Sequence, residues 1–236
     1  MTDFWVYFSA KPLLWIVLTV ATYMFSCWLN KRVGRSALLH PVLVSMAVLI
    51  ALLALTETRY ETYFSGAQFI HFLLGPATVA LAIPLCDYFD RIRRLWLPIL
   101  VALLVGSSVA IVSATGIAWL LGADSGTILT LAPKSVTSPI AIGIVEKIGG
   151  YPSMAAGLVL ITGVLGCLMS PYVFRLLKVR DEAVKGFSMG LSAHGLGTAQ
   201  ALGISSLAGA FAGMAMAVNG VVTAFLVPLL LSLAGI

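Results

Sequence analysis

Residues 131–150, LAPKSVTSPIAIGIVEKIGG, gather groups suited to anion binding in a chain that is otherwise mostly apolar. Pro133 and Pro139 flank Lys134 and three hydroxyl side chains. Proline lacks a backbone N–H and breaks the helix that precedes it, so a new helix can begin inside this segment. The free N–H groups and positive dipole end of a helix N-terminus attract anions. The candidate N-cap residues of that helix are Ser135, Thr137 and Ser138.

Lys134 is the charge in this segment that most needs an explanation. A lysine at membrane depth costs about 2.5–3.5 kcal/mol on insertion scales and usually marks a functional site. The alternative is that Lys134 extends its apolar stem to the membrane surface, and that the prolines only kink packed helices. Irregular backbone survives in lipid only where it is buried or lines a wet cavity. We therefore favour a binding site near the membrane midplane.

A second polar island covers residues 188–200, SMGLSAHGLGTAQ. Its glycines, Gly195 and Gly197 among them, permit a turn or a close approach of two backbones. His194 could bind an anion when protonated or relay a proton near neutral pH; the alternative is a histidine hydrogen-bonded between packed helices. Ser192 lies two residues from His194, so the two do not face each other on a helix. With no acidic residue nearby, the island does not indicate a serine hydrolase.

The pattern L-x-P-x-[ST]-V occurs at residues 74–79 and again at 131–136. Proline-interrupted segments at corresponding places are typical of transporter repeats that meet at a binding site. We predict a weak internal repeat of residues 74–119 and 131–176, with Thr78 facing the same site. The predicted helix-breaking positions are Pro76, Pro84, Pro133, Pro139, Gly195 and Gly197.

The elements that must position these groups are membrane helices. The chain has 236 residues, of which 60% are hydrophobic and 10% charged, whereas soluble domains carry about 25% charged residues. This length allows roughly six to eight transmembrane segments of about 20 residues. We predict an all-α integral membrane protein that forms one membrane domain, residues 1–236, with two re-entrant or broken helices. The predicted spans are residues 12–29, 36–56, 62–86, 95–123 and 148–174.

Basic residues predict the orientation of these spans. The loops at 30–35, 91–94 and 175–185 carry ten of the fourteen Lys and Arg residues, which places all three in the cytoplasm. The loop near 122–127 is then outside, so residues 128–147 cannot cross the membrane once. We predict that they enter and return, or cross as two short pieces. The stretch from 186 onward is too long for one helix and must break or turn.

Several function classes are disfavoured. The net charge of +5 arises from loops between spans, so we expect no nucleic-acid partner. Cys27, Cys86 and Cys167 are dispersed and have no C-x-x-C spacing. No metal-ligand set, nucleotide-binding loop or catalytic triad is visible. We therefore expect neither enzymatic activity, nor a cofactor, nor a bound metal.

Three segments carry a family resemblance: LLGPATVALAIPL (73–85), PKSVTSPIAIGI (133–144) and SAHGLGTAQA (192–201). They resemble the signatures of the CidB/LrgB family of bacterial inner-membrane proteins, and the resemblance covers essentially the whole chain. It implies a multi-pass protein of the bacterial inner membrane. It also implies two functions: holin/antiholin-like modulation of murein hydrolase activity and autolysis with a small CidA/LrgA-type partner, and transport of small carboxylates.

The broken helices and the buried lysine favour the carrier. We predict a secondary transporter of small carboxylates such as pyruvate, glycolate, glycerate or lactate, with His194 as the candidate for proton coupling. The predicted substrate-binding residues are Thr78, Lys134, Ser135, Thr137, Ser138, His194 and Thr198. We expect the lipid bilayer, the anion, a CidA/LrgA-type protein and further copies of the chain as partners. The alternative, a holin-like regulator, predicts unselective permeability that does not depend on Lys134.

Overall fold

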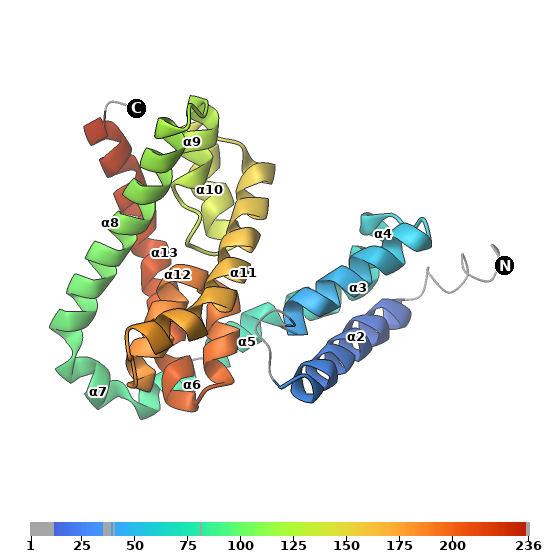
Figure 1. The fold of residues 1–236 in the computed structure, drawn as a ribbon. Coiled ribbons are helices and arrows are strands. Elements are labelled where there is room, and N and C mark those ends of the chain that lie inside the picture. Colours follow the sequence, from blue (N-terminus) through green and yellow to red (C-terminus); the bar gives the residue numbers. More distant parts are fainter. Residues whose placement is uncertain (1–11, 35–38, 40, 81, 235–236) are drawn as a thin grey trace. The chain divides into compact units, whose positions relative to one another are not determined.

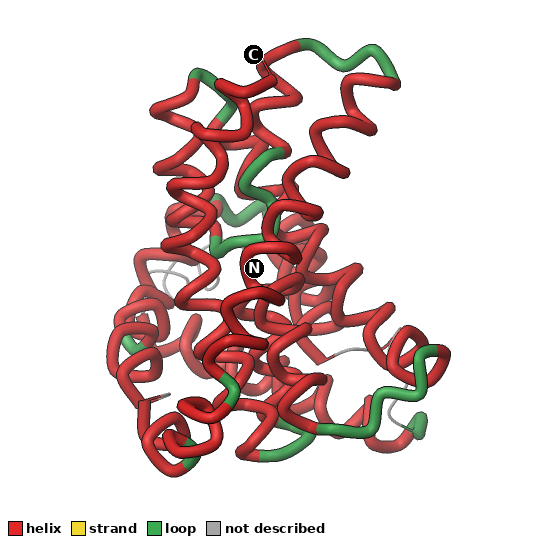
Figure 2. The backbone as a smooth tube through the Cα atoms, turned by 90° about the vertical axis from the view of Figure 1, so that its left-hand side faces the viewer, coloured by secondary structure: helices red, strands yellow, loops and turns green. Residues whose placement is uncertain are grey.

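The computed structural model describes residues 12–34, 39, 41–80 and 82–234 (Figure 1). Figure 2 shows that the regular structure of these residues is helical, and no strand occurs among them. The prediction of an all-α membrane protein is confirmed. Within the described ranges, four helices are long and apolar enough to cross a membrane: Pro12–Arg32, Trp96–Leu120, Pro152–Leu176 and Ser206–Leu233. The helix Pro41–Leu55 is apolar but shorter.

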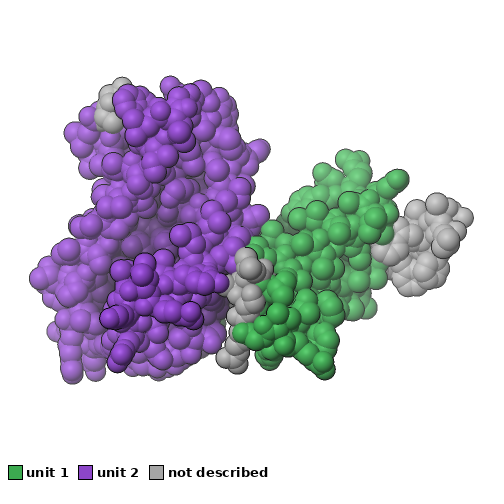
Figure 3. Space-filling model, in the orientation of Figure 1, with its two compact units in different colours: residues 1–80 green, residues 81–236 purple. Residues whose placement is uncertain are grey.

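The chain forms two compact units, residues 1–80 and residues 81–236 (Figure 3). The helices of the first unit are α2 (Pro12–Arg32), α3 (Pro41–Leu55), α4 (Tyr60–Phe72) and α5 (Leu74–Ala80). Helix α2 packs against α3 and α4. At the α2–α4 contact, the buried Trp15 ring lies edge-on to Tyr63, with 5.6 Å between the ring centroids. The single membrane domain and the internal repeat both stay predictions.

A proline interrupts the predicted span 62–86 near its middle. Helix α4 ends at Phe72, four residues before Pro76. Proline has no N–H to donate to the carbonyl four residues earlier, so the helix ends there. The predicted break at Pro76 therefore falls one turn ahead of the proline itself. The predicted break at Pro84 stays a prediction, because Leu81 lies outside the described residues.

The second unit contains three long helices with shorter ones between them (Figure 1). In order they are α6 (Ala82–Asp87), α7 (Phe89–Arg94), α8 (Trp96–Leu120), α9 (Ser125–Leu131), α10 (Ser138–Ile148), α11 (Pro152–Leu176), α12 (Glu182–Leu202) and α13 (Ser206–Ala234). The long apolar helices α8, α11 and α13 match the length needed to cross a bilayer. The irregular backbone of the unit lies between the short helices α9 and α10 and at a break inside α12.

Helices α9 and α10 form a re-entrant hairpin, which we call hairpin 1 (residues 125–148). Its two ends meet at Tyr151: the Tyr151 hydroxyl donates to Asp124 Oδ2 at 3.2 Å, and the Tyr151 N–H donates to Thr130 Oγ1 at 2.8 Å. The chain therefore leaves the hairpin at the end where it entered. Gly149, with φ 84°, ends α10 in the left-handed conformation that favours glycine. The predicted reversal of the chain within residues 128–147 is confirmed.

Helix α12 is a second hairpin, hairpin 2 (residues 182–202). Its helical backbone is interrupted at His194, with φ 42° and ψ −127°. A Cβ added at Gly197 would collide with the Met189 carbonyl oxygen, although in one straight helix residues eight apart are separated by about 12 Å. The second arm thus folds back on the first. The Ser205 hydroxyl donates to Glu182 Oε2 at 2.7 Å, which brings both ends of the hairpin together.

The two hairpins enter the unit from opposite ends (Figure 1). Arg91, before α8, pairs with Asp181, before hairpin 2, at 2.7 Å. The basic loops that these two residues mark therefore share one end, as predicted from their charge. Hairpin 1 follows α8 and precedes α11, so it starts from the other end of these long helices.

The base of hairpin 1 gives a pH-dependent prediction. The Thr127 hydroxyl, at 2.6 Å, and the Thr127 N–H, at 3.0 Å, both donate to the exposed Asp124 carboxylate and hold its pKa below the ordinary 3.8. A lowered pKa in the folded state means that this stabilisation is complete above pH 3.8 and is lost as pH falls through the folded pKa. We expect wild type to melt above Asp124→Asn at neutral pH, with the gap closing in acid. A gap that widens as pH falls would contradict this.

Candidate anion site at the hairpin tips

The tip of hairpin 1 is the segment between α9 and α10. Thr137 is the N-cap of α10, with extended backbone at φ −68° and ψ 150°, but its side chain makes no capping hydrogen bond. Pro139 lies in the first turn of α10, where its missing N–H costs nothing. The first N–H groups of this 11-residue helix therefore lack a side-chain cap. Backbone donors left in this state are suited to an anion.

Lys134 lies in the same tip, half-buried beside the buried Pro133 and Ser135. Its backbone N–H donates to the Leu131 carbonyl at 3.2 Å. Among the described residues, no carboxylate lies within ion-pair distance of its ammonium group. A half-buried cation without a counter-charge and an uncapped helix N-terminus thus occur within four residues of one another.

The tip of hairpin 2 is held by its own hydrogen bonds. His194 is 6% exposed, and its Nε2 lies 2.9 Å from the Val159 carbonyl oxygen of α11. A carbonyl only accepts, so Nε2 carries the proton and Nδ1 is the nitrogen open to a second proton. The Thr198 hydroxyl donates to the His194 carbonyl at 2.9 Å. These contacts match the alternative of a histidine hydrogen-bonded between packed helices, and they occupy the Thr198 proton that we expected to face a carboxylate.

Asn219, in the middle of α13, joins the two tips and was not predicted from the sequence. Its side-chain N–H groups donate to the Ser135 carbonyl of hairpin 1 at 3.3 Å and to the Leu191 carbonyl of hairpin 2 at 3.1 Å. Its Oδ1 accepts from Ser107 of α8 at 2.7 Å and from Thr223 at 3.1 Å. One side chain, 1% exposed, thus bonds to both hairpins and to α8. The available signal was an amide inside a long apolar helix.

The tips also share a contact on α11. Val159 packs against Val136 and Ala141 of hairpin 1, and its carbonyl holds His194 of hairpin 2. The structure thus brings the Lys134 segment and the His194 segment to one layer of the second unit. Thr78 lies in α5 of the first unit, and its side chain is outside the described part. The helical break of hairpin 2 falls on His194, while Gly195 and Gly197 lie in the arm that follows.

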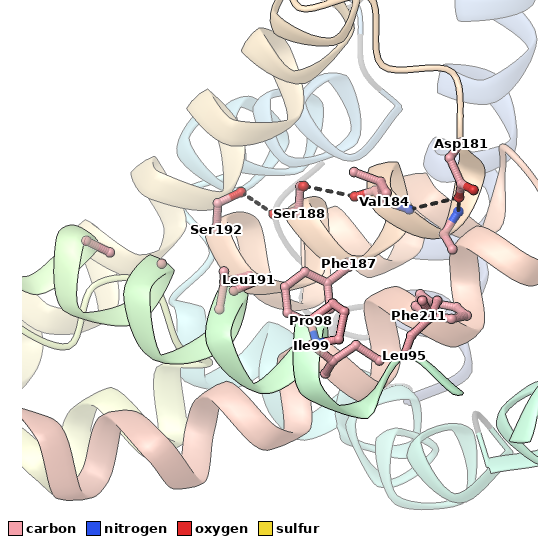
Figure 4. Close-up of a pocket in the computed structure, with 14 residues that line it drawn as sticks. Leu95, Pro98, Ile99, Asp181, Val184, Phe187, Ser188, Leu191, Ser192 and Phe211 are labelled. Carbon is pink, nitrogen blue, oxygen red and sulfur yellow. Dashed lines mark hydrogen bonds between the residues drawn. The ribbon is translucent and has the colours of Figure 1, made fainter. Parts of the chain in front are cut away.

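A separate cavity of about 600 Å³ lies along the first arm of hairpin 2, between that arm, α8 and α13. Leu95, Phe187 and Phe211 contribute to its mostly apolar lining (Figure 4). The Ser188 hydroxyl donates to the Val184 carbonyl and the Ser192 hydroxyl to the Ser188 carbonyl, so neither hydroxyl is available as a donor to the cavity. This lining suits apolar groups better than a hydrated anion.

These features define a class: a multi-pass helical membrane protein in which two hairpins enter from opposite ends and meet at a buried amide. The profile of the LrgB-like family matches residues 19–233, and the chain belongs to this family. The resemblance to the CidB/LrgB family is thereby confirmed.

Relatives match along nearly the whole chain. It is 38% identical over 217 residues to "Uncharacterized protein YwbG" of Bacillus subtilis (strain 168), which covers 92% of this chain and 96% of that protein. It is 30% identical over 227 residues to "Antiholin-like protein LrgB" of Bacillus mycoides (strain KBAB4), which covers 96% of this chain and 99% of that protein. No solved structure matches the chain.

Proposed function

We propose that the protein is a secondary carrier of a small carboxylate such as pyruvate, glycolate, glycerate or lactate, in the bacterial inner membrane. The observation that carries this proposal is the tip of hairpin 1. There the uncapped N-terminus of α10 follows Lys134, whose ammonium group has no counter-charge among the described residues. Discontinuous helices whose N-termini point at an anionic substrate are a recurring device of secondary transporters.

The chemistry of binding follows from these groups. The two carboxylate oxygens would accept from the first N–H groups of α10 and from the hydroxyls of Thr137 and Ser138. The Lys134 ammonium group would supply the compensating charge. Asn219 would keep this tip aligned with hairpin 2 through its bond to the Ser135 carbonyl. His194 would supply proton coupling through Nδ1, since its Nε2 is engaged by Val159.

An antiholin-like role is the second candidate, and the names of the relatives favour it over the carrier. The Bacillus mycoides relative is called an antiholin-like protein. In this reading the chain would modulate murein hydrolase activity and autolysis together with a CidA/LrgA-type partner and further copies of itself. Neither candidate function needs catalytic residues. The expectation that the protein is not an enzyme stays a prediction.

Uptake into proteoliposomes separates the two candidates. Labelled pyruvate, glycolate, glycerate and lactate are offered with and without a pH gradient to wild type, Lys134→Gln and Lys147→Gln. We expect saturable uptake whose apparent KM rises about tenfold or more in Lys134→Gln, equivalent to at least about 1.4 kcal/mol of lost binding. Lys147→Gln is the matched control, because Lys147 is exposed in the last turn of the same hairpin.

Two other results would contradict the proposal. Leakage of all four solutes alike, unaffected by Lys134→Gln, would reject the carrier and leave the antiholin-like role. If Lys134→Gln and Lys147→Gln lower uptake by the same amount, uptake depends on the total positive charge of hairpin 1 and not on Lys134 in particular. The proposed site would then be wrong.

A further inference from the structure

A pocket with both polar and apolar lining lies at the base of hairpin 2, away from the tip. It encloses about 400 Å³ between the last turns of α11 and both arms of α12. We call it the base pocket. Its polar lining includes Arg175, Lys185 and Gln200, and its apolar lining includes Phe174, Met189 and Ile204.

Gln200 is the first sign that the base pocket takes a ligand. Its Oε1 is buried and has no hydrogen-bond partner within the part of the chain that the structure describes. Native proteins rarely bury a polar atom without a partner, because the atom gives up its bonds to water and gains none in return. An acceptor in this state is suited to an N–H or O–H donor on a bound molecule.

The charge at the base pocket is the second sign. Arg175 and Lys185 both line it, and neither forms an ion pair with any described carboxylate. The two acidic residues that precede and begin hairpin 2 are engaged elsewhere. Asp181 pairs with Arg91 at 2.7 Å, and Glu182 accepts from the Ser205 hydroxyl at 2.7 Å. The pocket therefore presents two cations and one buried acceptor.

We propose that the base pocket binds an anionic head group, a phosphate or a carboxylate, that also carries a hydroxyl or amine donor. The cations would hold the anion, Gln200 would accept from the donor, and the apolar side chains would cover the carbon atoms between. The head group of an anionic glycerophospholipid and a soluble hydroxyl-bearing anion share this chemistry. The occupant would bridge α11 and both arms of hairpin 2, and would stabilise the hairpin from its base. This site is independent of the anion site at the tips.

The test compares two double variants of the full-length protein in detergent. Arg175→Gln/Lys185→Gln removes both cations of the base pocket. Lys178→Gln/Arg180→Gln removes two charges from the same loop that do not line it. Melting temperatures are measured with glycerol phosphate, and separately with mixed micelles of phosphatidylglycerol or phosphatidylcholine.

We expect one anionic probe to raise the melting temperature of wild type and of the loop variant, with apparent affinity at least about tenfold weaker in the pocket variant. A shift with glycerol phosphate identifies a soluble ligand, and a shift with phosphatidylglycerol alone identifies a lipid head group. If both double variants lose the shift equally, or if no probe shifts wild type, the proposal is overturned.

Gln200→Leu tests the acceptor separately. It removes a buried unpartnered oxygen, so we expect the empty protein to melt at a higher temperature than wild type. For a soluble ligand, it should also abolish the preference for glycerol phosphate over methyl phosphate, which has no hydroxyl. For a lipid, it should reduce the shift given by phosphatidylglycerol. An empty variant that melts lower, with ligand preference unchanged, would show that Gln200 has only a structural role.

Discussion

Asn219→Leu is expected to lower the free energy of unfolding by about 2–6 kcal/mol and to abolish uptake. The substitution keeps the branched shape and the number of heavy atoms of the side chain but removes the donors to the Ser135 and Leu191 carbonyls. Each buried polar group left without a partner costs about 1–3 kcal/mol, and two are left here. The loss of the Asn219 oxygen costs less at Ser107, because the Ser107 hydroxyl can still donate a hydrogen bond to the Leu103 carbonyl at 2.7 Å.

Thr223→Val is the matched control for Asn219→Leu. It removes one hydrogen bond to Asn219 Oδ1, at 3.1 Å, and leaves both links to the hairpins. We expect a cost of about 0.5–1.5 kcal/mol, the usual net contribution of one hydrogen bond, and uptake close to wild type. Chemical unfolding in detergent and the proteoliposome assay measure the two effects. Equal costs for the two variants would show that Asn219 does not hold the hairpin tips together.

Gly190→Ala is expected to destabilise the second unit by about 3 kcal/mol or more, or to prevent folding. A Cβ at Gly190 would collide with the Ala212 carbonyl oxygen of α13, and one at Gly186 would collide with that of Ala208. These neighbours are backbone atoms, which cannot rotate away as a flexible side chain can. Small residues spaced four apart commonly allow such close approach of membrane helices.

Gly143→Ala provides the comparison for Gly190→Ala. Gly143 lies inside α10, and a Cβ added there meets no atom within 4 Å. Alanine is favoured over glycine in a helix by about 0.8–1.0 kcal/mol, so this variant should be neutral or slightly more stable. Yield in the membrane fraction and the melting temperature in detergent report both outcomes. A tolerated Gly190→Ala would mean that α12 and α13 are not in backbone contact.

Hairpin 1 could be predicted from the sequence because lipid restricts what a chain can do. A segment with outside loops on both flanks has to return, and Pro133 and Pro139 mark where the backbone is interrupted. The same reasoning predicts the interruption near Pro76, where α4 ends one turn earlier, at Phe72. This offset of one turn arises because proline leaves the carbonyl four residues earlier without a donor.

The rest of the site depends on long-range packing that no local pattern contains. Asn219 is one amide in a 29-residue apolar helix, and its partners are decided by how α13 aligns with two hairpins. The break at His194 uses a positive φ that is disfavoured for a residue with a Cβ. It is held by the bond to Val159, which is 35 positions away along the chain. Residue type alone pointed to Gly195 and Gly197 for that turn.

The spacing of the glycine contacts gives the second unit unequal stiffness. Gly186 and Gly190 meet Ala208 and Ala212, a constant offset along both chains, so the first arm of hairpin 2 runs parallel to α13 with backbone on backbone. Gly197 fastens the second arm to the first in the same way. Between hairpin 1 and α13, by contrast, the described contacts run through side chains: the Asn219 amide reaches the Ser135 carbonyl, and the Ile140 methyl lies against Gly220. Hairpin 2 and α13 therefore form one block, and any rearrangement that opens the tips has to part the molecule along the seam between Ser135 and Asn219.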